Sequence, residues 1–130
     1  MLLAHDATIV VTDGQKLRLF RNTGTEFHLA LTEQPQPDVS GKVEGASRHH
    51  AGEGKKDHQE VSYEAAVAKW LNHEITTGRI GAVFVIAPPR ALGELRLHYG
   101  KMLQEKLIGE LAKEHANDTV HVLTQAIKDA

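Results

Sequence analysis

The strongest candidate for binding chemistry in this sequence is the string Pro88-Pro89-Arg90. It follows an apolar run and precedes a helical pattern, so Arg90 is expected where a strand gives way to a helix N-terminus. Free N–H groups at such a corner attract anions, and open α/β sheets often bind ligands there. With Arg96, Arg90 could hold a phosphate or a carboxylate. The alternative is a structural corner in which Arg90 makes a local ion pair.

A second candidate is the polar segment from about 34 to 60, which is rich in glycine, proline and charge and predicts a long mobile loop. Between Gln34 and Gln59 its basic residues are Lys42, Arg48, Lys55 and Lys56, and its acidic residues are Asp38, Glu44, Glu53 and Asp57. The loop is therefore neutral until a histidine takes a proton, and any affinity for RNA or phosphate should rise as pH falls. The alternative is a solvated loop that binds nothing alone.

The loop histidines His49, His50 and His58, with Glu53 and Asp57, invite a metal-site interpretation, since imidazole and carboxylate ligate transition metals. Their spacing matches no known framework, and ordering a mobile loop costs entropy. We therefore predict adventitious metal binding rather than a native site, and no cofactor.

No catalytic residue is predicted. A two-metal nuclease needs converging carboxylates, and Asp13, Glu94 and Asp118 are not expected to converge. The serines lack a Gly-x-Ser-x-Gly elbow, and the absence of cysteine excludes thiolate chemistry. Trp70, at helical spacing with apolar neighbours, is assigned to the core rather than to base stacking.

The first third of the chain predicts the antiparallel strands that would support these sites. A β-branched run from 4 to 11, the turn Asp13-Gly14 and the alternating run 16–21 predict a hairpin. A second turn at 22–24 and alternation over 27–31 add a third strand. The result is a three-stranded meander.

The remaining elements follow the polar segment. Ser62 is a plausible N-cap for a helix over about 61–77, and Gly78 is a stop signal. The run 81–87 is apolar on both faces and predicts a strand at the middle of the sheet. A helix with Leu92, Leu95 and Leu97 follows, and Gly100 interrupts it. Residues 102–113 fit a helix, with a short strand over 107–112 equally permitted. Asn117 or Asp118 could cap a final helix that turns Val120, Leu123, Thr124 and Ile127 inward.

Composition limits the class of protein. A chain of 130 residues with 41% hydrophobic residues is expected to form one domain, 1–130, with one core. A formal net charge of −2 argues against wholesale coating of nucleic acid or anionic membrane, although a local basic patch remains open. No stretch approaches the roughly 18 apolar residues of a membrane span, and no export signal is recognised. We therefore expect a cytoplasmic protein without membrane insertion.

The string Val85-Ile86-Ala87-Pro88-Pro89-Arg90-Ala91-Leu92-Gly93-Glu94-Leu95-Arg96 resembles the signature APPR-x-LG-x-LR of the bacterial host-attachment protein family. The order of the other elements is similar over nearly the whole chain. That family looks like a distant relative of the middle domain of archaeal and eukaryotic class-1 peptide release factors. The resemblance implies an RNase H-like α/β (α+β) fold, a mixed sheet with helices packed on it. It also favours the strand over 107–112.

In release factors the loop before the first long helix holds Gly-Gly-Gln, which helps water attack peptidyl-tRNA. Here the corresponding loop contains Ala51-Gly52-Glu53-Gly54-Lys55-Lys56, and Gly-Gly-Gln occurs nowhere in the chain. The resemblance therefore implies binding without release-factor catalysis. The family's link to attachment implies at most an indirect role, because the chain shows no export signal.

The sequence thus predicts a non-catalytic binding protein that acts on the ribosome or on structured RNA. The contacts would come from the 35–60 loop, with Arg48, Lys55 and Lys56, and from the corner Pro88-Pro89-Arg90 with Arg96. Two alternatives stay open. One is a protein-interaction domain with an unknown partner that contributes indirectly to cell attachment, and the other is a hydrolase that uses a divalent metal gathered by the loop.

Overall fold

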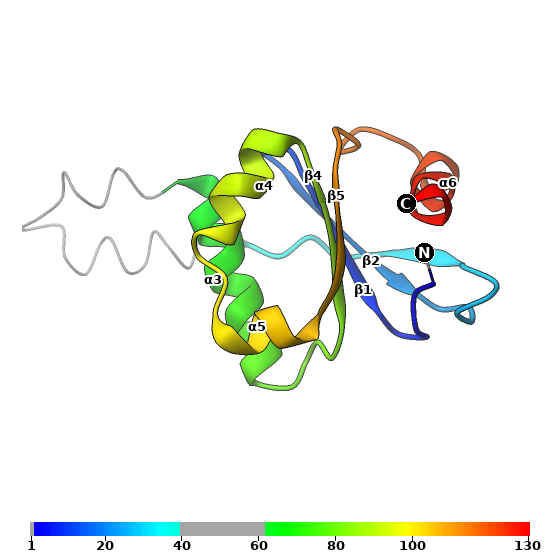
Figure 1. The fold of residues 1–130 in the computed structure, drawn as a ribbon, viewed down its shortest axis with the longest axis horizontal. Helices are drawn as coiled ribbons and strands as arrows, with labels where there is room; N and C mark the ends of the chain where they lie inside the picture. Colours follow the sequence, from blue (N-terminus) through cyan, green and yellow to red (C-terminus); the bar gives the residue numbers. More distant parts are fainter. Residues whose placement is uncertain (1, 40–61) are drawn as a thin grey trace, which may run out of the picture.

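The computed structural model describes residues 2–39 and 62–130. Within them five strands form one mixed sheet in the order β3-β2-β1-β4-β5. Figure 1 shows α3, α4 and α5 on one face of this sheet and α6 on the other. The strands are β1 (Thr8–Thr12), β2 (Leu17–Asn22), β3 (Leu31–Gln34), β4 (Val83–Ala87) and β5 (Leu107–Ala112), and the helices are α3 (Tyr63–Thr76), α4 (Pro89–Arg96), α5 (Lys101–Lys106) and α6 (Val120–Asp129). The predicted mixed sheet with helices packed on it is confirmed.

The predicted hairpin forms from β1 and β2, which pair antiparallel from Thr8↔Arg21 to Thr12↔Leu17. Its turn depends on two local features. The carboxylate of Asp13 accepts the backbone N–H groups of Gln15 and Lys16, both at 2.9 Å. Gly14 adopts φ 95°, a left-handed conformation that glycine enters without the steric cost of a side chain.

The third strand of the meander exists, but its predicted position over 27–31 is wrong. β3 begins only at Leu31, which pairs with Asn22, and Phe27 is 70% exposed in the preceding loop. The reason is the buried side chain of Asn22, whose Oδ1 accepts the N–H groups of Gly24 and Ala30. These bonds hold residues 23–30 as a loop before pairing starts.

The apolar run at 83–87 forms β4, which pairs in parallel with both β1 and β5. All five of its residues are buried. Val83, Val85 and Ala87 face the core under α3, α4 and α5, while Phe84 and Ile86 face the core under α6. The predicted internal strand is confirmed, although the middle place in the sheet belongs to β1.

The predicted helix over 61–77 is observed as α3. Ser62 caps it as expected, with its hydroxyl accepting the N–H of Ala65 at 3.0 Å, and Gly78 follows the end with φ 82°. Trp70 is buried in the core on this face of the sheet, as predicted. No helix in the described ranges is long and apolar enough to cross a bilayer.

The ambiguous stretch after Gly100 divides into α5 and β5, so the strand favoured by the resemblance is confirmed. The predicted caps of the last helix are wrong. Thr119 caps α6 instead, because Asn117 accepts a hydrogen bond from Lys16 and Asp118 from His115. Of the residues expected to face inward on α6, Leu123 and Ile127 are buried, whereas Val120 is exposed.

The prediction that Leu97 is an apolar residue of the helix, together with Leu92 and Leu95, is also wrong. It is 75% exposed, because α4 ends at Arg96 and Leu97 lies beyond the face that packs on the sheet. Leu92 and Leu95, which lie within the helix, are buried as predicted.

We expect Asn22→Ala to destabilise the fold by about 2–4 kcal/mol. The side chain is fully buried, and its Nδ2 lies within 3.0–3.3 Å of the carbonyl oxygens of Leu3, Ala4 and Thr25. Its loss removes the partner of the Leu3 carbonyl and of the N–H groups of Gly24 and Ala30, whereas the carbonyls of Ala4 and Thr25 keep bonds from the N–H groups of Ala7 and His28. Urea unfolding measures the change. Asn117→Ala, which removes an exposed hydrogen bond, is the control, and an equally small effect at both positions would contradict this role.

Candidate functional site

The predicted corner after β4 is present. The strand ends at Ala87, and Pro88 then serves as the N-cap of α4 with extended backbone (φ −61°, ψ 156°). Pro89 takes the first helical position, where its missing N–H costs nothing because that group would have no partner within the helix. The first intrahelical bond runs from the N–H of Leu92 to the carbonyl of Pro88 at 2.8 Å. The chain therefore reverses sharply and begins a helix at the carboxyl end of a buried strand.

Arg90 is exposed on the first turn of this helix. No side chain caps the turn, and it contains no acidic residue. Among residues 2–39 and 62–130, no ion pair or hydrogen bond engages its guanidinium. The positive end of the helix dipole and one unpaired guanidinium thus face the same solvent, which is an arrangement that attracts anions.

Three parts of the chain meet beside this corner. A Cβ placed on Gly14 would lie 2.5 Å from Oε2 of Glu64 and 3.9 Å from Cβ of Ala91. The turn after β1, the first turn of α3 and the first turn of α4 therefore contact one another at the edge where β1 and β4 end. We call this place the carboxyl edge of the sheet.

Glu64 was not singled out by the sequence, yet it is a buried carboxylate at this edge, only 5% exposed. It occupies the first turn of α3, where a negative charge complements the helix dipole. Its position two residues after the cap Ser62 was the available signal. Sequence periodicity could not show that the turn at Gly14 covers it.

Arg96 lies in the last turn of α4, while Arg90 lies in the first. Its guanidinium binds Oε1 of Glu110 on β5, with Nη2 at 2.6 Å and Nε at 2.9 Å. The other oxygen of Glu110 accepts the hydroxyl of Tyr99 at 3.0 Å. The hydrogen bond and the charge of Glu110 raise the pKa of Arg96. Arg96 is therefore engaged in a local ion pair that ties α4 to β5, and the structure does not bring it to Arg90.

The predicted phosphate contacts Arg48, Lys55 and Lys56 lie outside the described residues, as do His49, His50 and His58. In the sequence the segment that contains them lies between Val39, which is buried in the core with α3, and Ser62, which caps α3. The first turn of α3, which Ser62 caps, belongs to the carboxyl edge. Within the described ranges no group of three or more histidine, aspartate or glutamate side chains could hold a metal ion.

Alkaline conditions should destabilise the fold through Tyr99. Burial, and then the charge of Glu110, raise the pKa of Tyr99 well above the ordinary 10.0, and burial also raises the pKa of Tyr63. The folded protein therefore holds these protons more tightly than the unfolded chain does. The resulting stability is complete below about pH 10 and is lost as pH rises through the raised pKa.

The free energy of unfolding in urea, measured between about pH 8 and pH 11, tests this expectation. The Tyr99→Phe variant should lose roughly 1 kcal/mol less than the wild type over that range. Tyr63→Phe is the matched control and should keep most of the dependence. Identical pH profiles for the wild type and Tyr99→Phe would show that burial and Glu110 do not raise the pKa of Tyr99.

Residues 6–127 match the family model described as bacterial archaeo-eukaryotic release factor family 12. A comparison with curated proteins finds no match. The match spans every strand and almost all of α6, so it confirms the predicted likeness to release factors, while the link to host attachment stays a prediction. The chain therefore belongs to bacterial archaeo-eukaryotic release factor family 12.

Proposed function

We propose that this protein is a non-catalytic binding protein that contacts the phosphates of structured RNA, on the ribosome or free of it. The contacts would come from the corner around Arg90 and from the 35–60 segment. The observation that supports this most is the guanidinium of Arg90, which has no partner among the described residues, on a first turn of α4 that no side chain caps. Phosphate oxygens are the ligands for which a guanidinium and free helix N–H groups are both suited.

The position of the corner adds support. Ser62, which follows the segment in the sequence, caps α3, and the first turns of α3 and α4 meet beside the same turn at Gly14. In the proposed contact the cations of the segment would act together with Arg90. The sequence supplies Arg48, Lys55 and Lys56 as cations, with three histidines that add charge as pH falls.

Two carboxylates of the carboxyl edge, those of Asp13 and Glu64, oppose the attraction of a phosphate, and both also have a structural role. Asp13 accepts two N–H groups of its own turn, and Glu64 is buried at the N-terminus of α3. The first turn of α4 itself contains no acidic residue, so the exposed charge on that turn is that of Arg90. The absence of Gly-Gly-Gln from the sequence is the reason to propose binding without peptidyl-tRNA hydrolysis.

Arg90→Ala should weaken salt-sensitive binding. We expect wild-type protein to sediment with ribosomes at low salt and to bind structured RNA, and the variant to bind several-fold more weakly. Loss of one phosphate contact should reduce the magnitude of the slope of log affinity against log salt by about 1. Sedimentation through sucrose gradients and filter binding over a salt series measure both.

Lys106→Ala is the matched control for that experiment. Lys106 is exposed at the end of α5, just before β5, so this variant removes the same charge at the opposite end of the parallel strands. Its affinity should stay close to wild type. The proposal fails if wild-type protein neither sediments with ribosomes nor binds RNA at low salt, or if both variants bind equally weakly.

The contribution of the 35–60 segment is tested separately by Arg48→Ala, Lys55→Ala and Lys56→Ala in one chain. This triple variant should lose more affinity than Arg90→Ala because three cations are removed. Wild-type affinity should rise from about pH 7.5 to about pH 5.5 as histidines gain charge. Replacing His49, His50 and His58 with alanine should remove that rise. A triple variant that binds like the wild type would exclude the segment from the contact.

A further inference from the structure

A separate cleft lies at the other end of the parallel strands, which we call the amino edge of the sheet. It has a volume of about 540 Å³ and is bounded by the starts of β1 and β4 and by the second half of α3. Sites for small organic ligands commonly fall between about 300 and 1,000 Å³. The cleft shares no lining residue with the corner at Arg90.

The floor of the cleft is apolar. Leu19 from β2, Trp70 from α3 and Ile80 from the turn before β4 line it, and all three belong to the core on that face. Each keeps a small exposed fraction, between 7% and 9%. A flat apolar group could therefore lie against these side chains.

The rim carries two guanidinium groups. Arg21 of β2 is half-exposed, and its ion pair with Asp6 is loose, with 3.9 Å between Nη1 and Oδ1. Arg79 is also exposed and pairs with Glu74 at 3.1 Å. Both arginines line the cleft, so each could turn a fork of N–H donors toward an anion held there.

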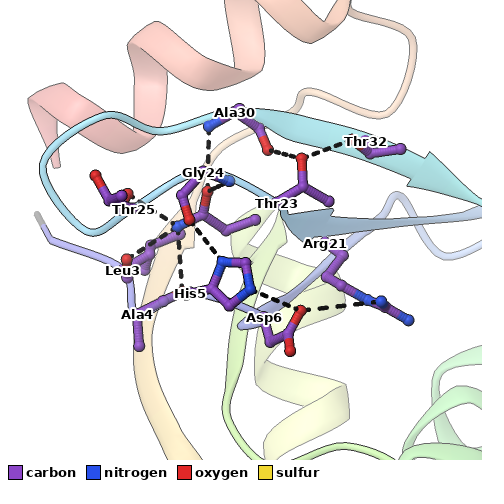
Figure 2. Close-up of polar contacts among 11 residues, drawn as sticks. Leu3, Ala4, His5, Asp6, Arg21, Thr23, Gly24, Thr25, Ala30 and Thr32 are labelled. Carbon is purple, nitrogen blue, oxygen red and sulfur yellow. Dashed lines mark hydrogen bonds and ion pairs between the residues drawn. The ribbon is translucent and has the colours of Figure 1, made fainter.

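The rim also carries a positioned carboxylate. Asp6 is the one non-glycine residue of the described chain with a positive φ, 71°, and its N–H donates to the carbonyl of Asn22 at 2.8 Å. His5 donates from Nδ1 to the carbonyl of Gly24 at 2.7 Å, which leaves Nε2 3.6 Å from the carboxylate of Asp6. Figure 2 shows Gly24, His5, Asp6 and Arg21 as one chain of contacts. Uncommon backbone conformations of this kind gather at ligand sites.

We infer that this cleft binds a nucleoside monophosphate. The two arginines would hold the phosphate, the carboxylates of Asp6 and Glu74 would accept the sugar hydroxyls, and the base would lie on the floor formed by Leu19, Trp70 and Ile80. A site for inorganic phosphate alone would have no use for an apolar floor or for carboxylates. A site for an apolar ligand would have no use for two arginines. The combination matches a ligand with an anionic, a hydroxylated and a flat apolar part.

Trp70 is the single tryptophan of the chain, so its fluorescence reports on this cleft. We expect adenosine monophosphate to change that fluorescence in a saturable manner, and isothermal titration calorimetry to give the same affinity. Adenosine and inorganic phosphate, titrated separately, should each bind at least tenfold more weakly. The inference is overturned if the nucleotide produces no saturable change, or if either fragment binds as tightly as the whole.

Variants separate the parts of the site. Arg21→Ala and Arg79→Ala should each weaken nucleotide binding by about tenfold or more, while Lys113→Ala, at an exposed position outside the cleft, should leave it unchanged. Asp6→Gly removes the carboxylate but suits the positive φ. It should keep the melting temperature and lose affinity for the nucleotide, with affinity for phosphate retained. Wild-type affinity in both arginine variants, or equal weakening by Lys113→Ala, would refute the assignment.

Discussion

The parallel pairing of β1 with β4 is the constraint on which the rest of this structure depends. Residues Thr8 to Val11 pair with Val83 to Ile86 in register, and β4 is buried on both faces. Two parallel strands end at the same edge, so the turn after β1 and the start of α4 must meet there. The same pairing brings the starts of the two strands together at the opposite edge. Both proposed binding sites, the corner at Arg90 and the cleft beside Trp70, are consequences of this one alignment.

Arg18 links α6 to the face of the sheet that this helix covers. Within residues 2–39 and 62–130, α3, α4 and α5 cover one face of the sheet and α6 covers the core on the other, as Figure 1 shows. Arg18 of β2 donates from Nη1 to the carbonyls of Ala116 and Asp118, which lie just before α6, and its guanidinium also binds Glu33 and stacks on Phe20 at 4.9 Å. The hydrogen bond from Arg18 lowers the pKa of Glu33. These contacts anchor α6 to the sheet from its N-terminal side.

The two arginines of α4 illustrate how partners decide the role of a charge. Arg90 and Arg96 belong to one helix and are both exposed, yet Arg96 is held by Glu110 while Arg90 meets no acid in the described chain. Glu110 occupies both Nε and Nη2 of Arg96, whereas in the described chain all the donors of Arg90 remain available to a phosphate. Family membership adds the release-factor relationship, and the sequence lacks the Gly-Gly-Gln of release factors. Binding at Arg90 without hydrolysis is consistent with both facts.

The sequence by itself determined the elements whose signals are local. The run 83–87 is apolar on both faces, and the turn at Asp13-Gly14 is held by the Asp13 side chain and neighbouring backbone N–H groups. Ser62 caps α3 by accepting the N–H of Ala65, three residues further on. The corner at Pro88 was likewise visible, because proline restricts its own backbone. Each of these follows from interactions within a few residues.

Only the tertiary structure decided the features that join distant residues. Asn22 accepts the N–H of Ala30, so β3 begins only after that residue. Asp118 accepts a hydrogen bond from His115 and does not cap α6. Arg96 binds Glu110, which lies fourteen residues further along the chain. The cleft gathers residues near positions 5, 20, 70 and 80, which no periodicity connects. The sequence specifies which side chains are charged and which are apolar. The residues that these side chains contact are set by strand register and helix packing, which depend on the whole chain at once.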